Sequence, residues 1–254
     1  NLMFLSSTQG LYTFNGKSTD LIIESEVYKT ITDSKDNNIL YIGGKDYLSI
    51  AKIDVGKINI IKTFNIAGEV RFLFQKNNKL YYGANGYGVG VIDLKNYNVK
   101  HFTENEGLPS LNDNSIFEYN NEILIGTAHG IYSLDEQNNK TSWNKNYNVY
   151  DKEAEIQISR PKAINNEIWF TGEGTLDKIE RIQEITTVKF ENGKTKKDNK
   201  YLKRIRDVSP KQFYKTDSLI YIVTSDGLYC YDLSFSGTQV NYLTLISSVL
   251  TKED

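Results

Sequence analysis

The sequence predicts an all-β fold: a β-propeller of about six four-stranded antiparallel blades, forming a single domain over residues 1–254. Three observations support this prediction. A strand–turn–strand motif recurs along the whole chain, and its copies are spaced by about the length of one propeller blade. The composition also suits strands, because 18 Tyr and 11 Phe accompany only 3 Pro.

The recurring motif is clearest at residues 123–132, ILIGTAHGIY. An apolar strand ends in a small residue, two or three turn residues follow, and a Gly opens a second apolar strand. This Gly suits a tight hairpin because it tolerates the positive φ that such a turn requires, and neighbouring Thr, Ser and Asn favour turns. The other copies lie at residues 2–12, 39–48, 80–89, 168–176 and 219–229.

The spacing of the copies matches a propeller blade. The residue in the position of Gly126 recurs at positions 6, 43, 83, 126, 171 and 223, so successive copies are 37, 40, 43, 45 and 52 residues apart. Propeller blades of four strands span roughly 40–50 residues. Inner strands are predicted before the motif, at residues 69–78, 115–121 and 211–217, and outer strands after it, at residues 98–102 and 185–190.

The two ends of the chain are complementary in pattern. The chain opens on the second strand of a blade, and residues 245–254 have the pattern of a first strand and its turn. Joined in space, they would complete one blade and remove two exposed strand edges. We therefore favour six blades closed by strand exchange, with part of a seven-bladed propeller as the alternative. The start at Asn1, without an initiator Met or a signal peptide, suggests a processed or excised piece of a longer protein.

One passage carries a family resemblance. Residues 107–110 read GLPS, residues 112–116 read NDNSI, and the motif ILIGTAHGIY follows. The passage at residues 107–134 resembles the two-component regulator propeller repeat, whose pattern runs GLPS-N-x-V/I, a short turn, and then LWIGT-x-x-GL. Residues 168–170, IWF, are similar to the Leu-Trp-Ile of that pattern, whereas GLPS occurs once only.

The resemblance implies a biological setting. Proteins with such repeats are mostly extracytoplasmic, periplasmic sensor regions of hybrid two-component histidine kinases that respond to glycans. It implies a homodimer formed through the parent receptor and a membrane anchor in segments outside this chain. Residues 242–249 are similar to the segment that leads into a Tyr-rich β-sandwich in that family, which would place the six-blade closure in question.

Composition excludes several partners. The net charge is −2 and the pI is about 5.9, so attraction to nucleic acid or to acidic lipid is not expected. No run of 18 apolar residues is present that could span a membrane. The lone Cys230 cannot form an internal disulfide and is predicted to be a buried structural thiol in a strand.

The sequence shows no catalytic centre, metal site or cofactor motif. Its two histidines, His101 and His129, fall on different strands without metal-ligand spacing, and His101 is predicted to lie on the surface of an outer strand. The Gly-rich residues 82–90 run from strand to strand, so they are interpreted as a blade hairpin rather than a phosphate-binding loop. The basic residues 194–206 are predicted to form a solvated loop, with contact to an acidic glycan as the alternative.

Candidate ligand contacts come from loops predicted to gather at one end of the propeller. Tyr87 could stack on a sugar ring, while Asn and Asp side chains could bond to hydroxyl groups; the alternative is that these residues only shape turns. The candidates are Asn85, Tyr87, Asn105, Glu106, Asn112, Asp113, His129, Glu173 and Asp226.

The predicted function is ligand sensing by an extracytoplasmic, non-catalytic propeller of a two-component receptor, with an oligosaccharide as ligand. One alternative is a protein-interaction scaffold of a surface or secretion complex, which would expose an apolar patch. Another is a glycan-cleaving propeller enzyme, which would need two carboxylates that converge at the axis.

Overall fold

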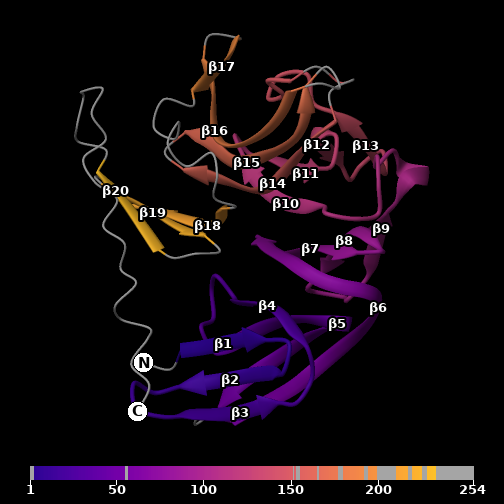
Figure 1. The fold of residues 1–254 in the computed structure, drawn as a ribbon. Helices are drawn as coiled ribbons and strands as arrows, with labels where there is room; N and C mark the ends of the chain where they lie inside the picture. The colour runs from indigo at the N-terminus through magenta and orange to yellow at the C-terminus, as the bar shows by residue number, and fades with distance from the viewer. Residues whose placement is uncertain are drawn as a thin grey trace. The chain divides into compact units, whose positions relative to one another are not determined.

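The computed structural model describes residues 3–54, 57–150, 152, 155–164, 166–176, 180–191, 194–198, 210–216, 219–224 and 228–232 (Figure 1). Regular structure in these ranges is β-strand, apart from one short 3-10 helix. The chain divides into two compact units. The first contains residues 1–117, 122–128 and 132–143, and the second contains residues 118–121, 129–131 and 144–254.

Two antiparallel sheets open the first unit. The strands of the three-stranded sheet are β1 (Met3–Ser7), β2 (Gly10–Phe14) and β3 (Thr19–Ile23). Those of the six-stranded sheet are β4 (Val27–Thr32), β5 (Ile39–Asp54), β6 (Lys57–Lys76), β7 (Lys79–Asn85), β8 (Gly88–Asp93) and β9 (Val99–Phe102). The 3-10 helix η1 (Glu104–Glu106) follows β9.

Three more sheets follow in chain order. The first is β10 (Ser115–Tyr119), β11 (Glu122–Thr127), β12 (Gly130–Asp135) and β13 (Lys140–Trp143). The second is β14 (Glu155–Ile164), β15 (Glu167–Leu176), β16 (Glu180–Glu191) and β17 (Lys194–Asp198). The third is β18 (Pro210–Lys215), β19 (Leu219–Thr224) and β20 (Leu228–Asp232).

Every sheet is built from strands consecutive in sequence, as the repeat predicts. The described strands form five sheets, so the predicted count of six separate blades is not confirmed. The difference arises at β5 and β6, which run for 16 and 20 residues within one sheet. Residues 245–254, predicted to complete a blade, lie outside the described residues.

The long strands β5 and β6 each change partner along their length. The start of β5 pairs with β4 as far as Gly44, and the remainder pairs with β6 after a register shift between Lys45 and Tyr47. Asp46, at this shift, has a φ of 64°. Similarly, β6 pairs with β5 through residues 57–65 and again at Glu69, opposite Lys45, and it pairs with β7 through residues 69–76.

The glycines of the motif serve two different purposes. Gly88 and Gly130 open the second strand of their hairpins with φ values of 84° and 99°, which confirms the predicted need for positive φ. Gly83 instead permits a close approach between backbones. A Cβ at this position would lie 2.0 Å from the carbonyl oxygen of Asn114, at the entry to β10. Gly43 is similar, because a Cβ there would lie 2.7 Å from the carbonyl oxygen of Val70.

The motif copies at residues 39–48 and 168–176 are not hairpins, which corrects the prediction. Strand β5 runs through the first copy without a turn. Strand β15 continues through the second copy and pairs with β16 over its length, from Ile168 opposite Val188 to Leu176 opposite Glu180. It also pairs with β14 on its other side. Because both edges of the backbone are already paired, residues 171–174 stay extended and do not turn.

This continuous strand shifts the remaining assignments in its sheet. Residues 185–190, predicted as an outer strand, lie in the third strand β16, and β17 is the strand at the edge. The basic stretch predicted as a loop therefore begins as this edge strand, and its residues 199–206 lie outside the described residues. Lys194, Lys196 and Lys197 are exposed on β17, where charged side chains discourage pairing with another chain.

The cores form where apolar strand residues face one another. One cluster joins β7, β8 and β9 to β10, β11 and β12, and Phe102 is completely buried within it. A second cluster is built on β5, β6 and β7 and includes Leu48, Val70 and Tyr82. Alternation is lost in strands such as β7, where residues 80–84 are all buried, because these strands are covered on both faces.

Candidate functional site

Four of the predicted ligand residues lie together in the first unit. We call Asn85, Tyr87, Asn112 and Asp113 the loop cluster; they belong to the β7–β8 hairpin and to the segment that enters β10. The backbone N–H of Asp113 donates to Asn85 Oδ1 at 2.9 Å. In return, the N–H of Gly86 donates to Asn112 Oδ1 at 2.8 Å.

These bonds show what the two asparagines do in the structure. Each side chain binds the backbone of the opposite loop, so the pair ties the hairpin to the following segment. Asp113 has a φ of 56°, a conformation that Asn and Asp adopt more readily than most residues. The turn-forming role that the sequence offered as the alternative is therefore present, and any ligand contact by Asn85 or Asn112 would be additional to it.

Tyr87 has a partner that the sequence did not indicate. Its ring stacks on the imidazole of His101 in β9, with ring centroids 4.0 Å apart and an angle of 21° between the planes. The His101 Nε2 atom contacts the Tyr87 carbonyl oxygen. Sequence analysis placed His101 on the surface of an outer strand, and no local pattern links it to a residue 14 positions earlier.

Glu106 is part of a helix cap. Its carboxylate accepts hydrogen bonds from the Thr103 backbone N–H and from the Thr103 hydroxyl, both at 2.8 Å, and the Asn105 N–H donates to the Thr103 hydroxyl. This reciprocal arrangement is a capping box at η1. The hydrogen bonds from Thr103 lower the pKa of Glu106 below its usual value of 4.5.

A Glu106→Gln variant is expected to lose a pH-dependent contribution to stability. Because the folded-state pKa is lowered, the ionised carboxylate stabilises the fold fully above pH 4.5 and loses this effect as pH falls through the folded-state pKa. The difference in unfolding free energy between wild type and variant should therefore be largest near neutral pH and decrease in acid. Urea unfolding over a pH series measures it, and a difference that does not vary with pH would contradict this assignment.

A charged cluster lies at the same end of the six-stranded sheet, and the sequence did not predict it. Glu69 pairs with Asn85 across β6 and β7. The Arg71 Nε atom donates to Glu69 Oε2 at 2.8 Å, and its guanidinium lies 5.3 Å from the centre of the Tyr28 ring. The Tyr28 hydroxyl contacts the carboxylates of Glu26 and Glu69, and the hydrogen bond to Glu26 raises the Tyr28 pKa.

Three predicted ligand residues lie neither in the loop cluster nor in η1. His129 lies in the second unit, in the turn of the β11–β12 hairpin, as predicted. Glu173 was predicted in a loop but lies within strand β15, opposite Gln157 and Gln183, because that strand does not turn. Asp226 lies outside the described residues, and so does the side chain of Cys230, whose backbone belongs to β20.

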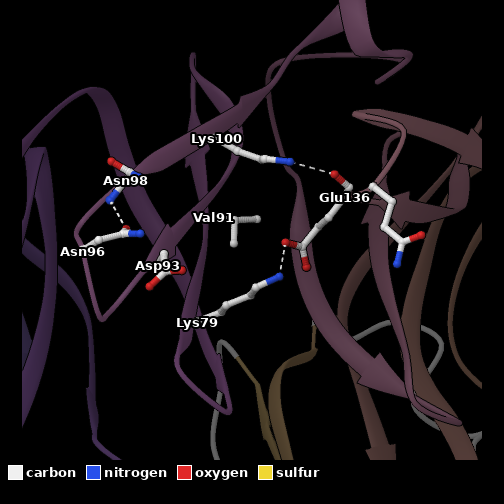
Figure 2. Close-up of a pocket in the computed structure, with 8 residues that line it drawn as sticks. Lys79, Val91, Asp93, Asn96, Asn98, Lys100 and Glu136 are labelled. Atoms are coloured by element: carbon white, nitrogen blue, oxygen red, sulfur yellow. Dashed lines mark hydrogen bonds and ion pairs between the residues drawn. The ribbon is translucent and has the colours of Figure 1, made fainter.

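The first unit also contains a pocket of about 330 Å³ that the sequence did not predict (Figure 2). We call it the hairpin groove, because the β8–β9 hairpin and the turn after β12 form its walls. It lies at the opposite end of β7 and β8 from the loop cluster, since Lys79 pairs with Asp93 at this end and Ala84 with Gly88 at the other. The lining residues are Lys79, Val91, Asp93, Asn96, Asn98, Lys100, Glu136 and Gln137.

Glu136 connects the two walls of the hairpin groove. The Lys79 Nζ atom lies 2.6 Å from Glu136 Oε2, and the Tyr81 hydroxyl donates to Glu136 Oε1 at 2.7 Å. The Lys100 Nζ atom donates to the Glu136 carbonyl oxygen at 2.8 Å. Side chains from β7 and β9 thus make three contacts with Glu136, which lies in the turn between β12 and β13.

Clustered metal-ligating side chains and long apolar helices are both absent from the part of the chain that the structure describes. Within it, no group of three or more His, Cys, Asp or Glu side chains is arranged to hold a metal ion. The described residues also include no helix with the length and apolar character needed to cross a membrane.

Comparison with known proteins identifies the fold. No family model matches the chain, and no curated protein matches it in sequence. It is similar to the extracellular domain of the putative hybrid two component system BT4673 from B. thetaiotaomicron, with a TM-score of 0.73 and 19% identity over 98% of this chain and 32% of that one. A second structure of this domain, described as a putative one component system, gives a TM-score of 0.71 and 19% identity over 91% and 30%.

BamB from Moraxella catarrhalis is also similar, with a TM-score of 0.61 and 12% identity over 96% of this chain and 85% of that one. The chain spans about a third of the length of the BT4673 structures. At these identities the similarity concerns the fold, and it agrees with the sequential antiparallel sheets described above. The chain is therefore an all-β protein with a β-propeller arrangement, as its repeats predict.

Proposed function

We propose that this chain is a non-catalytic, ligand-sensing propeller of an extracytoplasmic two-component receptor and that it responds to glycan-derived oligosaccharides. The observation that carries the proposal is the structural similarity to the extracellular domain of BT4673, which covers 98% of this chain. The resemblance of residues 107–134 to the two-component regulator propeller repeat supports the same setting independently of the structure.

Sensing places a physical requirement on the ligand. A ligand shifts a receptor between two states only if it binds one of them more tightly than the other. In this proposal the propeller binds the ligand through its loops, and the receptor, a homodimer anchored through segments outside this chain, converts the preference into a signal. At the loop cluster, the stacked Tyr87 and His101 rings are the aromatic surface proposed to contact a sugar, and the nearby ion pair of Arg71 and Glu69 offers charged hydrogen-bonding groups.

We further propose that the fold comprises six blades. The six-stranded sheet contains two copies of the motif, and β5 and β6 each divide between two partners. If residues 39–44 and 47–54 of β5 act as separate strands, and residues 57–65 and 69–76 of β6 likewise, the sheet holds two four-stranded blades. The shift at Asp46, with its positive φ, supports a turn between the halves of β5.

The sensing proposal is tested by thermal unfolding of the purified chain with neutral, sulfated and uronic oligosaccharides. A ligand that binds only the folded form, at about 100 times its dissociation constant, stabilises by roughly 2.7 kcal/mol. We expect a selective rise in the melting temperature with one class and no release of smaller sugars. Release of product would indicate the glycan-cleaving alternative, and an absence of any shift would contradict oligosaccharide sensing by this chain and favour the scaffold.

A further inference from the structure

The hairpin groove has the surfaces of a small-molecule site. Its volume of about 330 Å³ lies at the lower end of the range for ligand pockets, roughly 300–1,000 Å³. Figure 2 shows the side chain of Val91 between the two walls, with Asp93, Asn96 and Asn98 on one side and Glu136 on the other. Val91 lines the groove and is 4% exposed, so it presents a small apolar surface at the base of the polar lining.

Some polar groups of the groove already form hydrogen bonds or ion pairs with other residues of the protein. Glu136 binds Lys79 and Tyr81 through its carboxylate and Lys100 through its carbonyl oxygen. The Asn96 side chain accepts the backbone N–H of Asn98 at 2.9 Å and so closes the β8–β9 hairpin. These contacts hold the walls in place without closing the space between them.

The other polar groups of the groove are available to a ligand. The side-chain amides of Asn98 and Gln137 are exposed and form no hydrogen bond to any residue that the structure describes. Asp93, which lines the groove, uses Oδ1 to accept the Lys95 N–H at 2.8 Å, and its Oδ2 accepts no hydrogen bond from any residue that the structure describes. Two amides, each both donor and acceptor, therefore stand beside one carboxylate acceptor.

The charges of the lining decide the ligand class. Lys79 and Lys100 are balanced in number by Asp93 and Glu136, so the lining has no net charge. Lys79 pairs with the Glu136 carboxylate, whereas Lys100 donates to the Glu136 carbonyl oxygen. Because the charges of the lining cancel, the groove favours neither an anion nor a cation over a neutral ligand. A neutral ligand with many hydroxyl groups can donate to the carboxylate and both donate to and accept from the amides, while its C–H face packs on Val91.

We propose that the hairpin groove binds a neutral, hydroxyl-rich ligand of monosaccharide size through Asn98, Gln137 and Asp93, with Val91 as the small apolar surface at its base. This site is separate from the loop cluster, at the other end of β7 and β8, and all of its residues belong to the first unit. The inference depends on the groove alone and does not require that the chain act as a sensor.

The test is binding of glucose, galactose and mannose to the 254-residue chain, measured by ligand-observed NMR and by calorimetry at millimolar sugar. We expect at least one of these sugars to bind, and glucuronate and glucosamine to bind more weakly than their neutral counterpart. The double variant Asn98→Ala/Gln137→Ala should bind about tenfold more weakly, because each lost amide removes a hydrogen bond of about 0.5–1.5 kcal/mol. Both side chains are exposed, so the fold should be retained.

The matched control is Asn59→Ala, which removes an exposed amide from β6 outside the groove and should leave sugar binding unchanged. The proposal is overturned if none of the three neutral sugars binds, or if glucuronate binds more tightly than glucose. It is also overturned if a sugar binds equally well to the wild type and to the double variant. In that last case a loss of binding in Tyr87→Ala would place the sugar at the loop cluster, and the sensing proposal would survive without the groove.

Discussion

Replacing Gly83 by Val is expected to destabilise the first unit by about 3 kcal/mol, because the new side chain has no space. A Cβ at this position would lie 2.0 Å from the carbonyl oxygen of Asn114, which is a backbone atom and not the end of a flexible side chain. Asn114 is itself held, since it is 2% exposed and its side-chain Nδ2 donates to the Ser110 carbonyl oxygen at 2.8 Å. Relief would therefore require strand β7 and the entry to β10 to separate.

Urea unfolding followed by tryptophan fluorescence measures this effect, with Trp143 as the reporter in the first unit. Gly86→Ala is the control, because a Cβ there meets nothing within 4 Å although φ is 82°. The Gly86→Ala variant should lose only about 1 kcal/mol of unfolding free energy, which is the cost of placing alanine in the left-handed conformation. If the two variants were equally stable, the close approach of Gly83 to Asn114 would not be what requires a small residue at this position of the motif.

Replacing Phe102 by Ala is expected to cost about 4 kcal/mol, within the range for removal of a buried aromatic ring. Phe102 has no exposed surface and packs in the cluster that joins β7, β8 and β9 to β10, β11 and β12. Its loss would leave a cavity beside Leu108 and Ile116, and would weaken packing between two sheets as well as within one. In the same urea experiment, the Phe102→Ala variant should unfold with a lower urea midpoint than the wild type.

Val99 provides the control for Phe102 on the same strand. It is 44% exposed at the start of β9, and Val99→Ala should change the unfolding free energy by less than about 0.5 kcal/mol. A comparable loss in the two variants would indicate that β9 contributes through its backbone pairing with β8 and not through the buried ring. A loss confined to Phe102→Ala would confirm that this strand is held by the core between the sheets.

The motif predicted local structure well where a hairpin contains its own turn residues. The β7–β8 and β11–β12 hairpins lie where residues 80–89 and 123–132 place them, and their glycines have positive φ. The prediction failed at residues 39–48 and 168–176, which resemble the motif but remain extended in β5 and β15. Residues in a Gly-containing stretch can turn or pair, and the choice depends on whether a neighbouring strand is present to pair with them.

The candidate site was only partly predictable for a similar reason. Asn85, Tyr87, Asn112 and Asp113 were selected because loops at one end of consecutive hairpins meet. One hydrogen bond joins Asp113 to Asn85, and a second joins Gly86 of the same hairpin to Asn112. The stack of His101 on Tyr87 and the contacts of Arg71 with Tyr28 and Glu69 depend on strand register. A shift of one residue would turn each of these side chains to the other face of its sheet, so composition and spacing do not reveal such contacts.

The all-β class, the order of strands and the propeller arrangement could be predicted before the structure, because they follow from apolar alternation and turn residues that repeat about every 40 residues. Which side chains meet became known from the three-dimensional structure. It brought Glu136 to Lys79 across 57 positions and formed the hairpin groove beside them. It also showed that Gly83 is small because another backbone passes beside it. Such contacts join residues far apart in the chain, and their geometry is set by the packing of one sheet against the next.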